Sequence, residues 1–551
     1  MRHTSVGDKH VLILREENPL KKVILYNSIP RQRTKVQTLV VSTPFVKVTD
    51  RMGQPVQCQI SPIWIGPAAL TVARYELSFL VTVPGFGITT YVIHALSKSS
   101  FPPYVISFFK LLNIYFYNST FLLFIICREV HVANITVFNT DINLPKIPGF
   151  NQIQVIPNAQ EFSITQRPEL SASFGKSGLL KALRVTNITV PVHLEFVKYG
   201  TRGSSKDKSG AYLFLPDKAE PDLVYMDNKC IIHLITGPIV SKVFVEFAHV
   251  RHTCILYNSP GTDGLGLRVH NEINISETQN YELAMRLSTD IASGDQFYTD
   301  LNGLNMIKRQ RFPKLPTQGN YYPMASSTYI EDKKLRLTVV TAQPLGVSSM
   351  APGQIEIMQD RRLLQDDNRG LGQGITDNLL TNHIFTFVLE KKKSFCISST
   401  PPTNHPSGVL SLYGHLASEE LLHPIIAMHP HNSLPFNLNA YFSPLRYDFP
   451  ADLSVVNFRV FPIPEGAGKG IGMVLHQAAL DMCWNDNSYL RYFNVSESVE
   501  VDLTKFLNYV DDWVISKAPL TFHNVGPSLK SPIVNLCPHQ ILPILFHKTQ
   551  S

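Results

Sequence analysis

Short segments in which apolar and polar residues alternate recur along this chain and constrain its fold more than any other feature. Tyr75–Val83 is the clearest case, because its apolar side chains fall on one face of a strand and its polar side chains fall mostly on the other. Lys242–Val250 and Leu335–Thr341 alternate in the same way. The chain also has 38 Pro and 30 Gly, which favour turns, and its helical periodicity is poor. We therefore predict a mostly β protein of consecutive antiparallel β-sandwich domains.

The chain is too long for one hydrophobic core, because it has 551 residues and single cores stop growing at about 250–300 residues. Within the first strand-rich region, Val36–Asp50 is interrupted by Pro44 and predicts two short strands. A stretch rich in Ser, Thr and Pro near residue 400 predicts a linker. The predicted divisions are a small β-sandwich at 21–98, an apolar insert at 99–130, a large super-sandwich at 150–393, a linker at 398–407 and a C-terminal β domain at 408–551.

Charge and cysteine content exclude two classes of function. The net charge of +7 comes from 50 basic and 43 acidic residues dispersed along the chain, which is too weak a signal for nucleic-acid binding. The seven cysteines show no C-x-x-C spacing, so the sequence contains no zinc-ribbon or thiol redox motif, and it does not determine their disulfide pairing.

Five Asn-x-Ser/Thr sequences suggest a lumenal protein, since they would be glycan acceptors in a secretory compartment. Against this, the only apolar run near the N-terminus is Val11–Leu14, which is shorter than the core of a signal peptide. The sequence as given therefore has no recognisable route into that compartment. The five asparagines are Asn118, Asn134, Asn187, Asn274 and Asn494.

The segment Gln354–Asn378, QIEIMQDRRLLQDDNRGLGQGITDN, concentrates charges and glycines in one place. Its first residues alternate as in a half-buried strand, and its glycines, Gly370, Gly372 and Gly374, permit positive φ and close backbone approach. The residues alone support a loop braced by salt bridges within the segment. Those pairs would join Asp360, Asp366 and Asp367 to Arg361, Arg362 and Arg369.

The same segment resembles the Golgi-type class II α-mannosidases of glycoside hydrolase family 38, in which a strand ending in IM-DRR leads into a Q-DDNRGL-QG turn. Further motifs occur in the family's order and extend the resemblance over most of the chain outside the insert. They are KSGAYLFLPD at Lys208–Asp217, QFYTDLNG at Gln296–Gly303, LPTQGNYYPMASSTYIED at Leu315–Asp332 and LTVVTAQPLGVSS at Leu337–Ser349. Residues 1–20 resemble the tail of the family's helical bundle.

The insert interrupts this family-like sequence. Phe101–Cys127 is long enough to span a bilayer, but Lys110, Asn113 and Asn118 lie near its middle. Our leading interpretation is a retained non-coding stretch or an error in the gene model. A buried or interfacial insert comes next, followed by a transmembrane helix.

The resemblance implies hydrolysis of terminal α-linked mannose from N-glycans, a mannose-bearing N-glycan as substrate and residence in the Golgi lumen, with a membrane anchor that this sequence lacks. Retaining hydrolysis needs two carboxyl groups about 5–5.5 Å apart. In this family these carboxyl groups and a zinc ion belong to an amino-terminal catalytic domain, and no stretch here matches it. We therefore assign no catalytic residue and no metal ligand, and expect zinc and the missing catalytic domain as components of the complete enzyme. The resemblance leaves a homodimer open.

Two substrate-binding residues carry over from the family's motifs. Tyr212, in the GAYLFLP motif, would hydrogen-bond sugar hydroxyls, and Arg369, in the DDNRGL motif, would line the same pocket partly through its backbone carbonyl. Their structural alternatives are a buried ring with a satisfied hydroxyl for Tyr212 and an ion pair with Asp366 or Asp367 for Arg369. The alternative function is a catalytically inactive β protein that binds carbohydrate or a protein partner.

Overall fold

The computed structural model describes most of the chain between residues 11 and 548. The apolar segment Phe101–Cys127 and most of the expected linker lie outside the described residues. The described ranges are 11–15, 19–66, 69–97, 130–141, 150, 153–167, 170–202, 206–224, 230–397, 407–429, 441–462, 469–484, 500–508 and 513–548.

The first unit is a small sandwich of two five-stranded sheets. The prediction for β7 (Ala69–Val83) is confirmed, because its alternate apolar side chains are buried between the sheets. Pro44 separates β3 (Arg33–Val41) from β4 (Val46–Thr49), as expected. One sheet also contains β1 (Val11–Leu12), β6 (Cys58–Gly66) and β9 (Val130–Val132); the other contains β2 (Leu20–Tyr26), β5 (Pro55–Val56), β8 (Ile88–Ala95) and β32 (Ile426–Met428).

Strand β1 lies in the stretch where we expected a remnant of helix. Its residues pair in parallel with Val40 and Val41 of β3. Leu12 and Leu14 are buried while Ile13 between them is exposed, which is the period of a strand rather than a helix.

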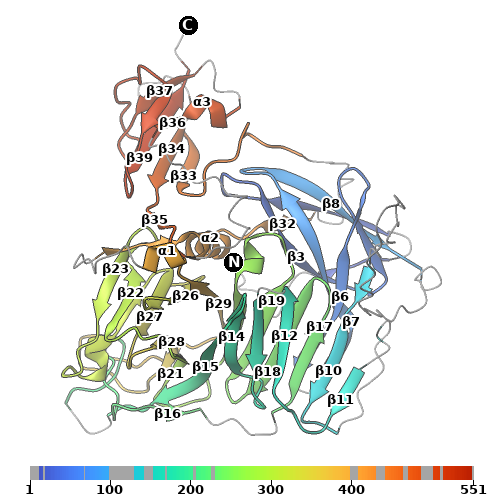
Figure 1. Ribbon diagram of the computed structural model, residues 1–551, viewed down its shortest axis with the longest axis vertical. Coiled ribbons are helices and arrows are strands. Elements are labelled where there is room, and N and C mark those ends of the chain that lie inside the picture. Colours follow the sequence, from blue (N-terminus) through green and yellow to red (C-terminus); the bar gives the residue numbers. More distant parts are fainter. Residues whose placement is uncertain are drawn as a thin grey trace.

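The second unit is a large sandwich whose sheets enclose one continuous core (Figure 1). The twelve-stranded sheet has the order β11 (Ile153–Ile156), β10 (Asn134–Phe138), β17 (Ile232–Thr236), β18 (Val240–Phe247), β19 (Val250–Tyr257), β20 (Leu267–Ile273), β29 (Thr381–Lys391), β26 (Leu335–Thr341), β25 (Ser327–Glu331), β22 (Gln296–Asp300), β23 (Met306–Gln310), β30 (Ser407–Gly408). Turn η1 (Thr262–Leu265) joins β19 to β20.

The facing sheet of the large sandwich carries the segments that matter for function. Its order is β12 (Phe162–Arg167), β13 (Leu170–Phe174), β14 (Leu180–Val185), β15 (Ile188–Tyr199), β21 (Tyr281–Thr289), β28 (Gln354–Arg362), β27 (Leu345–Ser348), β24 (Tyr322–Met324), with β16 (Asp222–Leu223) beside β15. Turn η2 (Thr317–Asn320) precedes β24. In β15 the side chains of Val190, Val192, Leu194 and Phe196 alternate into the core. Because β15, β21 and β28 are neighbours in this order, the end of β15, the start of β21 and the end of β28 lie side by side at one end of the sheet.

Helix α2 (Leu412–Leu422) packs between the units (Figure 1). Ser411 caps its N-terminus, and Tyr413, Ala417 and Leu421 pack on β26 and β29. At its other end, Glu419 pairs with Arg31 of the small sandwich. Residues 407–428 therefore pack with the two sandwiches, although the sequence placed residues after 408 in the last β domain.

The last β unit stands at one end of the molecule (Figure 1). Its main sheet has the order β33 (Leu453–Pro462), β34 (Lys469–Gln477), β39 (Ile541–His547), β37 (Val514–Lys517), and β36 (Glu500–Asp502) pairs with β38 (Ile533–Asn535) next to α3 (Leu503–Phe506). The predicted class, mostly β with antiparallel sandwiches, is confirmed. No helix among the described residues is long and apolar enough to cross a membrane.

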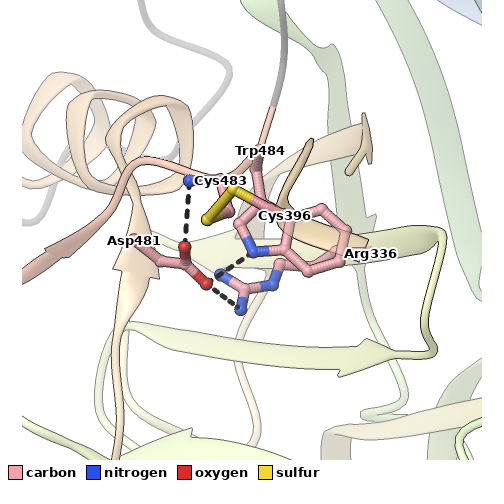
Figure 2. Close-up of a disulfide and its surroundings, with 5 residues drawn as sticks. All are labelled: Arg336, Cys396, Asp481, Cys483 and Trp484. Carbon is pink, nitrogen blue, oxygen red and sulfur yellow. Dashed lines mark hydrogen bonds and ion pairs between the residues drawn. A yellow bond between two sulfur atoms is a disulfide. The ribbon is translucent and has the colours of Figure 1, made fainter. Parts of the chain in front are cut away.

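A disulfide between Cys396 and Cys483 ties this last unit to the large sandwich (Figure 2). Cys396 lies in α1 (Ser394–Ile397), and Cys483 follows β35 (Leu480–Asp481), which pairs in parallel with β31 (Leu410–Ser411). The cysteines are 87 residues apart, and closing a loop of that length lowers the entropy of the unfolded chain, which stabilises the folded state by about 4.6 kcal/mol.

Beside the disulfide, Arg336 is 2% exposed and lies between two aromatic rings. Its guanidinium carbon is 4.2 Å from the ring centre of Tyr329 and 4.4 Å from that of Trp484. Arg336 also pairs with Glu331 at 2.5 Å. It pairs with Asp481 at 3.3 Å as well, and Asp481 accepts a hydrogen bond from Trp484 Nε1 at 2.7 Å (Figure 2). We call Arg336, Asp481, Trp484 and the disulfide the junction.

Candidate functional site

The charged loop after β28 is anchored at its base by two arginines. Arg361 pairs with the buried Glu282 of β21, with 2.6 Å between Nη2 and Oε1, and also donates to the carbonyl of Leu213 at 2.7 Å. Arg362 donates to the carbonyls of Thr278 at 3.0 Å and Thr376 at 2.8 Å. These contacts close the loop across the end of β28.

Glycines let the loop turn back on itself. Gly370 and Gly372 have φ of 100° and 74°, so they adopt the left-handed region that favours glycine. Gly374 approaches the backbone so closely that a Cβ there would lie 2.2 Å from the carbonyl oxygen of Leu363. The expected roles of these glycines are therefore confirmed.

The second motif, Lys208–Asp217, folds directly against this loop. Ser209 donates to Glu282 at 3.3 Å and accepts from the N–H of Leu215 at 2.6 Å. A Cβ on Gly210 would lie 2.5 Å from Cβ of Asp367, so only glycine lets the two segments meet here. The motifs are far apart in sequence and in contact in the structure.

Asp367 joins the two candidate residues. Its Oδ2 accepts hydrogen bonds from the N–H groups of Tyr212 at 2.6 Å and Leu213 at 3.0 Å, and its Oδ1 accepts from the N–H of Arg369 at 3.2 Å. Desolvation acts to raise the pKa of this carboxyl, but the donated N–H bonds outweigh it and lower the pKa. Asp367 is thus held as a carboxylate that fixes the backbone at both positions.

The side chains of Tyr212 and Arg369 both reach the protein surface. Tyr212 is 64% exposed, so the alternative that it is a buried core ring is wrong. Arg369 pairs with Asp207 at 3.0 Å, and the side chain of Arg369 is 45% exposed. The alternative of an ion pair with Asp366 or Asp367 is therefore wrong as well, because Asp367 binds the backbone of Arg369 and its guanidinium turns to another segment.

The ion pairs predicted within Gln354–Asn378 are also wrong in detail. Arg361 binds Glu282, and Arg369 binds Asp207. Asp366 instead accepts the backbone N–H groups of Asn368 and Gly372. The carboxylate of Asp366 shapes the turn, while Arg361 and Arg369 form their ion pairs with other segments.

A buried polar cluster supports the site from beneath. Phe214 contacts the rings of Tyr199 and Tyr321 edge-on, with centroids 5.3 Å away in both cases. The hydroxyls of both tyrosines donate to Oε1 of Glu356, whose Oε2 accepts from Nε of Arg286 at 2.6 Å. Burial, followed by the charge of Glu356, raises the pKa of both tyrosines. They therefore remain neutral donors, and Phe214, two residues after Tyr212, packs against their rings.

These groups can hold a hydroxylated ligand but are not arranged for metal binding. The exposed Tyr212 offers one donor and acceptor on an apolar ring, and Arg369 offers N–H donors. The acidic residues around them are engaged, because Glu282 binds Arg361 and Glu356 binds Arg286. No group of three or more His, Cys, Asp or Glu in the described part of the chain could hold a metal ion. The described residues therefore do not fit zinc.

Two residues of the site escaped the sequence analysis. Asp207 lies one position before the motif that we recognised, and a basic residue on either side of it made it look like solvated surface. Glu282 is a buried acid on β21, and an acidic residue directly before the apolar run Leu283–Met285 is the signal that could have identified it.

Comparison with known proteins identifies relatives for this arrangement. Residues 167–369 match a family described as the glycosyl hydrolases family 38 C-terminal domain. Human α-mannosidase 2 is 32% identical over 543 residues, which cover 98% of this chain and 44% of that protein. Drosophila melanogaster α-mannosidase 2 is 34% identical over 506 residues, covering 89% of this chain and 42% of the relative. The chain thus spans about two fifths of the length of these curated relatives.

Solved structures agree in fold. An α-mannosidase from Enterococcus faecalis V583 superimposes with a TM-score of 0.55 at 10% identity, over 97% of this chain and 56% of that chain. A second Enterococcus faecalis structure, of a protein in glycosyl hydrolase family 38, gives a TM-score of 0.52 at 11% identity, covering 96% of this chain and 58% of that chain.

Proposed function

Because this chain belongs to glycosyl hydrolase family 38, as its C-terminal β portion, we propose that it forms part of an α-mannosidase that hydrolyses terminal α-linked mannose from N-glycans. In this proposal the chain completes the sugar pocket with Tyr212 and Arg369. The main support for this proposal is Asp367, because its carboxylate fixes the backbone of Tyr212 and of Arg369 and leaves both side chains exposed.

The bond-breaking chemistry would belong to another part of the enzyme. A zinc ion in the complete enzyme would grip sugar hydroxyls, and its ligands, like the nucleophile and the acid, would lie outside residues 1–551. Tyr212 would donate to or accept from a sugar hydroxyl while its ring covers an apolar face of the sugar. Arg369 would orient the same sugar and keep water from that side. We place the enzyme in the Golgi lumen, and a disulfide in this chain fits an oxidising compartment.

The test is a comparison of two exposed tyrosines in the full-length enzyme. Tyr212→Phe is expected to lower kcat/KM about tenfold, because it removes one hydrogen bond to substrate, and to leave the melting temperature unchanged. The control is Tyr447→Phe, which alters a side chain that is 68% exposed and lies in the segment leading to β33. Equal kcat/KM for both variants would remove Tyr212 from the sugar pocket.

A further inference from the structure

Two of the described Asn-x-Ser/Thr sequences lie on exposed turns of the large sandwich. Asn187 belongs to the two-residue connection between β14 and β15, because Val185 on one side pairs with Ile188 on the other. Asn274 follows directly after β20. Both asparagines are exposed. We propose that Asn187 and Asn274 carry N-linked glycans.

The turn at Asn274 brings together the two side chains of the acceptor sequence. Oδ1 of Asn274 accepts hydrogen bonds from the N–H of Ser276 at 3.1 Å and from its hydroxyl at 2.6 Å. The hydroxyl that completes the acceptor sequence therefore already contacts the amide group.

Asn187 is exposed like Asn274, although the two turns have different backbone geometries. Thr186 has a positive φ of 55°, which is rare for a β-branched residue and marks a tight hairpin turn. The Thr186 hydroxyl donates to Oδ1 of Asn187 at 3.4 Å. Thr189, the third residue of the sequence, lies at the start of β15, so a glycan at this tip displaces no strand pairing.

The disulfide provides an independent argument about compartment. A bridge such as Cys396–Cys483 forms and persists in oxidising compartments, which include the lumen of the endoplasmic reticulum where asparagine is glycosylated. The inference thus rests on the lumenal location within the proposed function, while its two sites follow from the turns themselves.

The chemical step is a group transfer. Nδ2 of the asparagine forms a bond to C1 of an oligosaccharide carried on a lipid diphosphate. The bond between C1 and the diphosphate oxygen breaks, the lipid diphosphate leaves with that electron pair, and the amide loses one proton. The co-reactant is the lipid-linked oligosaccharide of the secretory pathway.

The two proposed glycosylation sites, Asn187 and Asn274, lie at different distances from Tyr212 and Arg369. Asn187 precedes β15, and the motif with Tyr212 follows it, so the 12 residues of the strand separate them by about 40 Å. The turn after Asn274 instead touches the charged loop, because Arg362 donates to the Thr278 carbonyl and Leu364 donates to Oδ1 of Asn280, each at 3.0 Å. A glycan on Asn274 therefore requires that the domain completing the pocket leave this turn uncovered.

The experiment uses the full chain directed to the secretory pathway of animal cells. Peptide N-glycosidase converts each glycosylated asparagine to aspartate, and mass spectrometry locates the converted residues. We expect conversion at both Asn187 and Asn274. Thr189→Ala and Ser276→Ala should each remove the mass of one glycan, whereas the matched variants Thr189→Ser and Ser276→Thr should retain it.

A non-reducing peptide map of the same material reports the Cys396–Cys483 disulfide and separates the two proposals. If the disulfide has formed and both asparagines are unmodified, the chain folds in the lumen and the glycosylation sites are wrong. If neither the disulfide nor a glycan is present, the glycosylation sites are wrong and the lumenal location loses the support of the disulfide.

Discussion

The candidate site and the junction both use buried charged groups to join distant segments, yet the side chains around these groups are exposed at the candidate site and covered at the junction. At the junction, the guanidinium of Arg336 is covered by two rings and bound by two carboxylates. At the candidate site, the carboxylate of Asp367 binds backbone N–H groups and no side chain among the described residues. Arg336 binds two side-chain carboxylates and also the backbone carbonyl of Val409 at 3.1 Å, whereas Asp367 binds the main chain alone within this described part.

This difference separates a structural contact from a ligand-binding one. The charged groups of the junction bind one another and are mostly buried, which suits a contact that holds the last β unit in place. A charge that binds backbone positions a loop without using its side chains, and Tyr212 and Arg369 therefore remain exposed. The comparison predicts large stability effects at the junction and small ones at the candidate site.

The largest effect is expected for Arg336→Met. The substitution keeps an apolar stem but leaves the carboxylates of Glu331 and Asp481 without their cation, which should cost about 3–5 kcal/mol in free energy of unfolding. Urea denaturation measures it. Arg459→Met is the control, because Arg459 stacks on Phe461 at 4.3 Å on an exposed strand surface. A loss at Arg336 no larger than at Arg459 would contradict the comparison.

A pH dependence should follow from Glu390, which pairs across strands with Arg336 and accepts from the Ser411 hydroxyl at 2.6 Å. Burial raises the pKa of Glu390 from 4.5 to about 7, against the lowering effect of Arg336. Between pH 4.5 and about pH 7, Glu390 keeps a proton in the folded chain that it releases in the unfolded chain. The contribution of Glu390 to the free energy of unfolding therefore falls by about 3 kcal/mol as the pH rises through this window.

Glu390→Gln stays neutral and should escape this loss. Its free energy of unfolding relative to the original protein should therefore increase by about 3 kcal/mol from about pH 4.5 to about pH 8. Taking the difference between the two proteins removes the contribution of the histidines that titrate in the same range. A difference that does not change with pH would show that Glu390 is ionised throughout.

At the candidate site, Asp367→Asn should loosen the backbone rather than unfold the domain. An amide offers one acceptor oxygen where the carboxylate offers two, so hydrogen exchange at the N–H groups of Tyr212 and Leu213 should accelerate at least about tenfold. Asp366→Asn is the matched control, since Asp366 binds Asn368 and Gly372 within its own turn. Equal acceleration in both variants would mean that Asp367 has no special role.

The smallest effect is expected for Arg369→Ala. Its pair with Asp207 is exposed, so the substitution should change the free energy of unfolding by less than about 0.5 kcal/mol. A double-mutant cycle with Asp207→Ala measures the coupling directly. A cost comparable to that of Arg336→Met would make Arg369 a structural residue and remove the contrast between the two regions.

Much of the fold follows from local patterns. The alternation in Tyr75–Val83 and Leu335–Thr341 predicted strands correctly, and so did the break at Pro44. Helix α2 was missed because it is buried on most of its surface and shows little of the apolar periodicity that marks a helix on a protein surface. The strand β1 was missed because its four-residue apolar run is too short to show a period.

The sequence by itself indicated several strands, the turns that need glycine and the family, and it proposed the two candidate residues. Only the tertiary structure decided which groups meet: Asp367 with the backbone of Tyr212, Arg361 with Glu282, and Cys396 with Cys483. The physical reason is the separation along the sequence of the residues that each interaction joins. Strand and turn formation depend on a few neighbouring residues, whereas an ion pair, a carboxylate that accepts distant N–H groups or a disulfide depends on where the whole sheet places residues far apart in the chain.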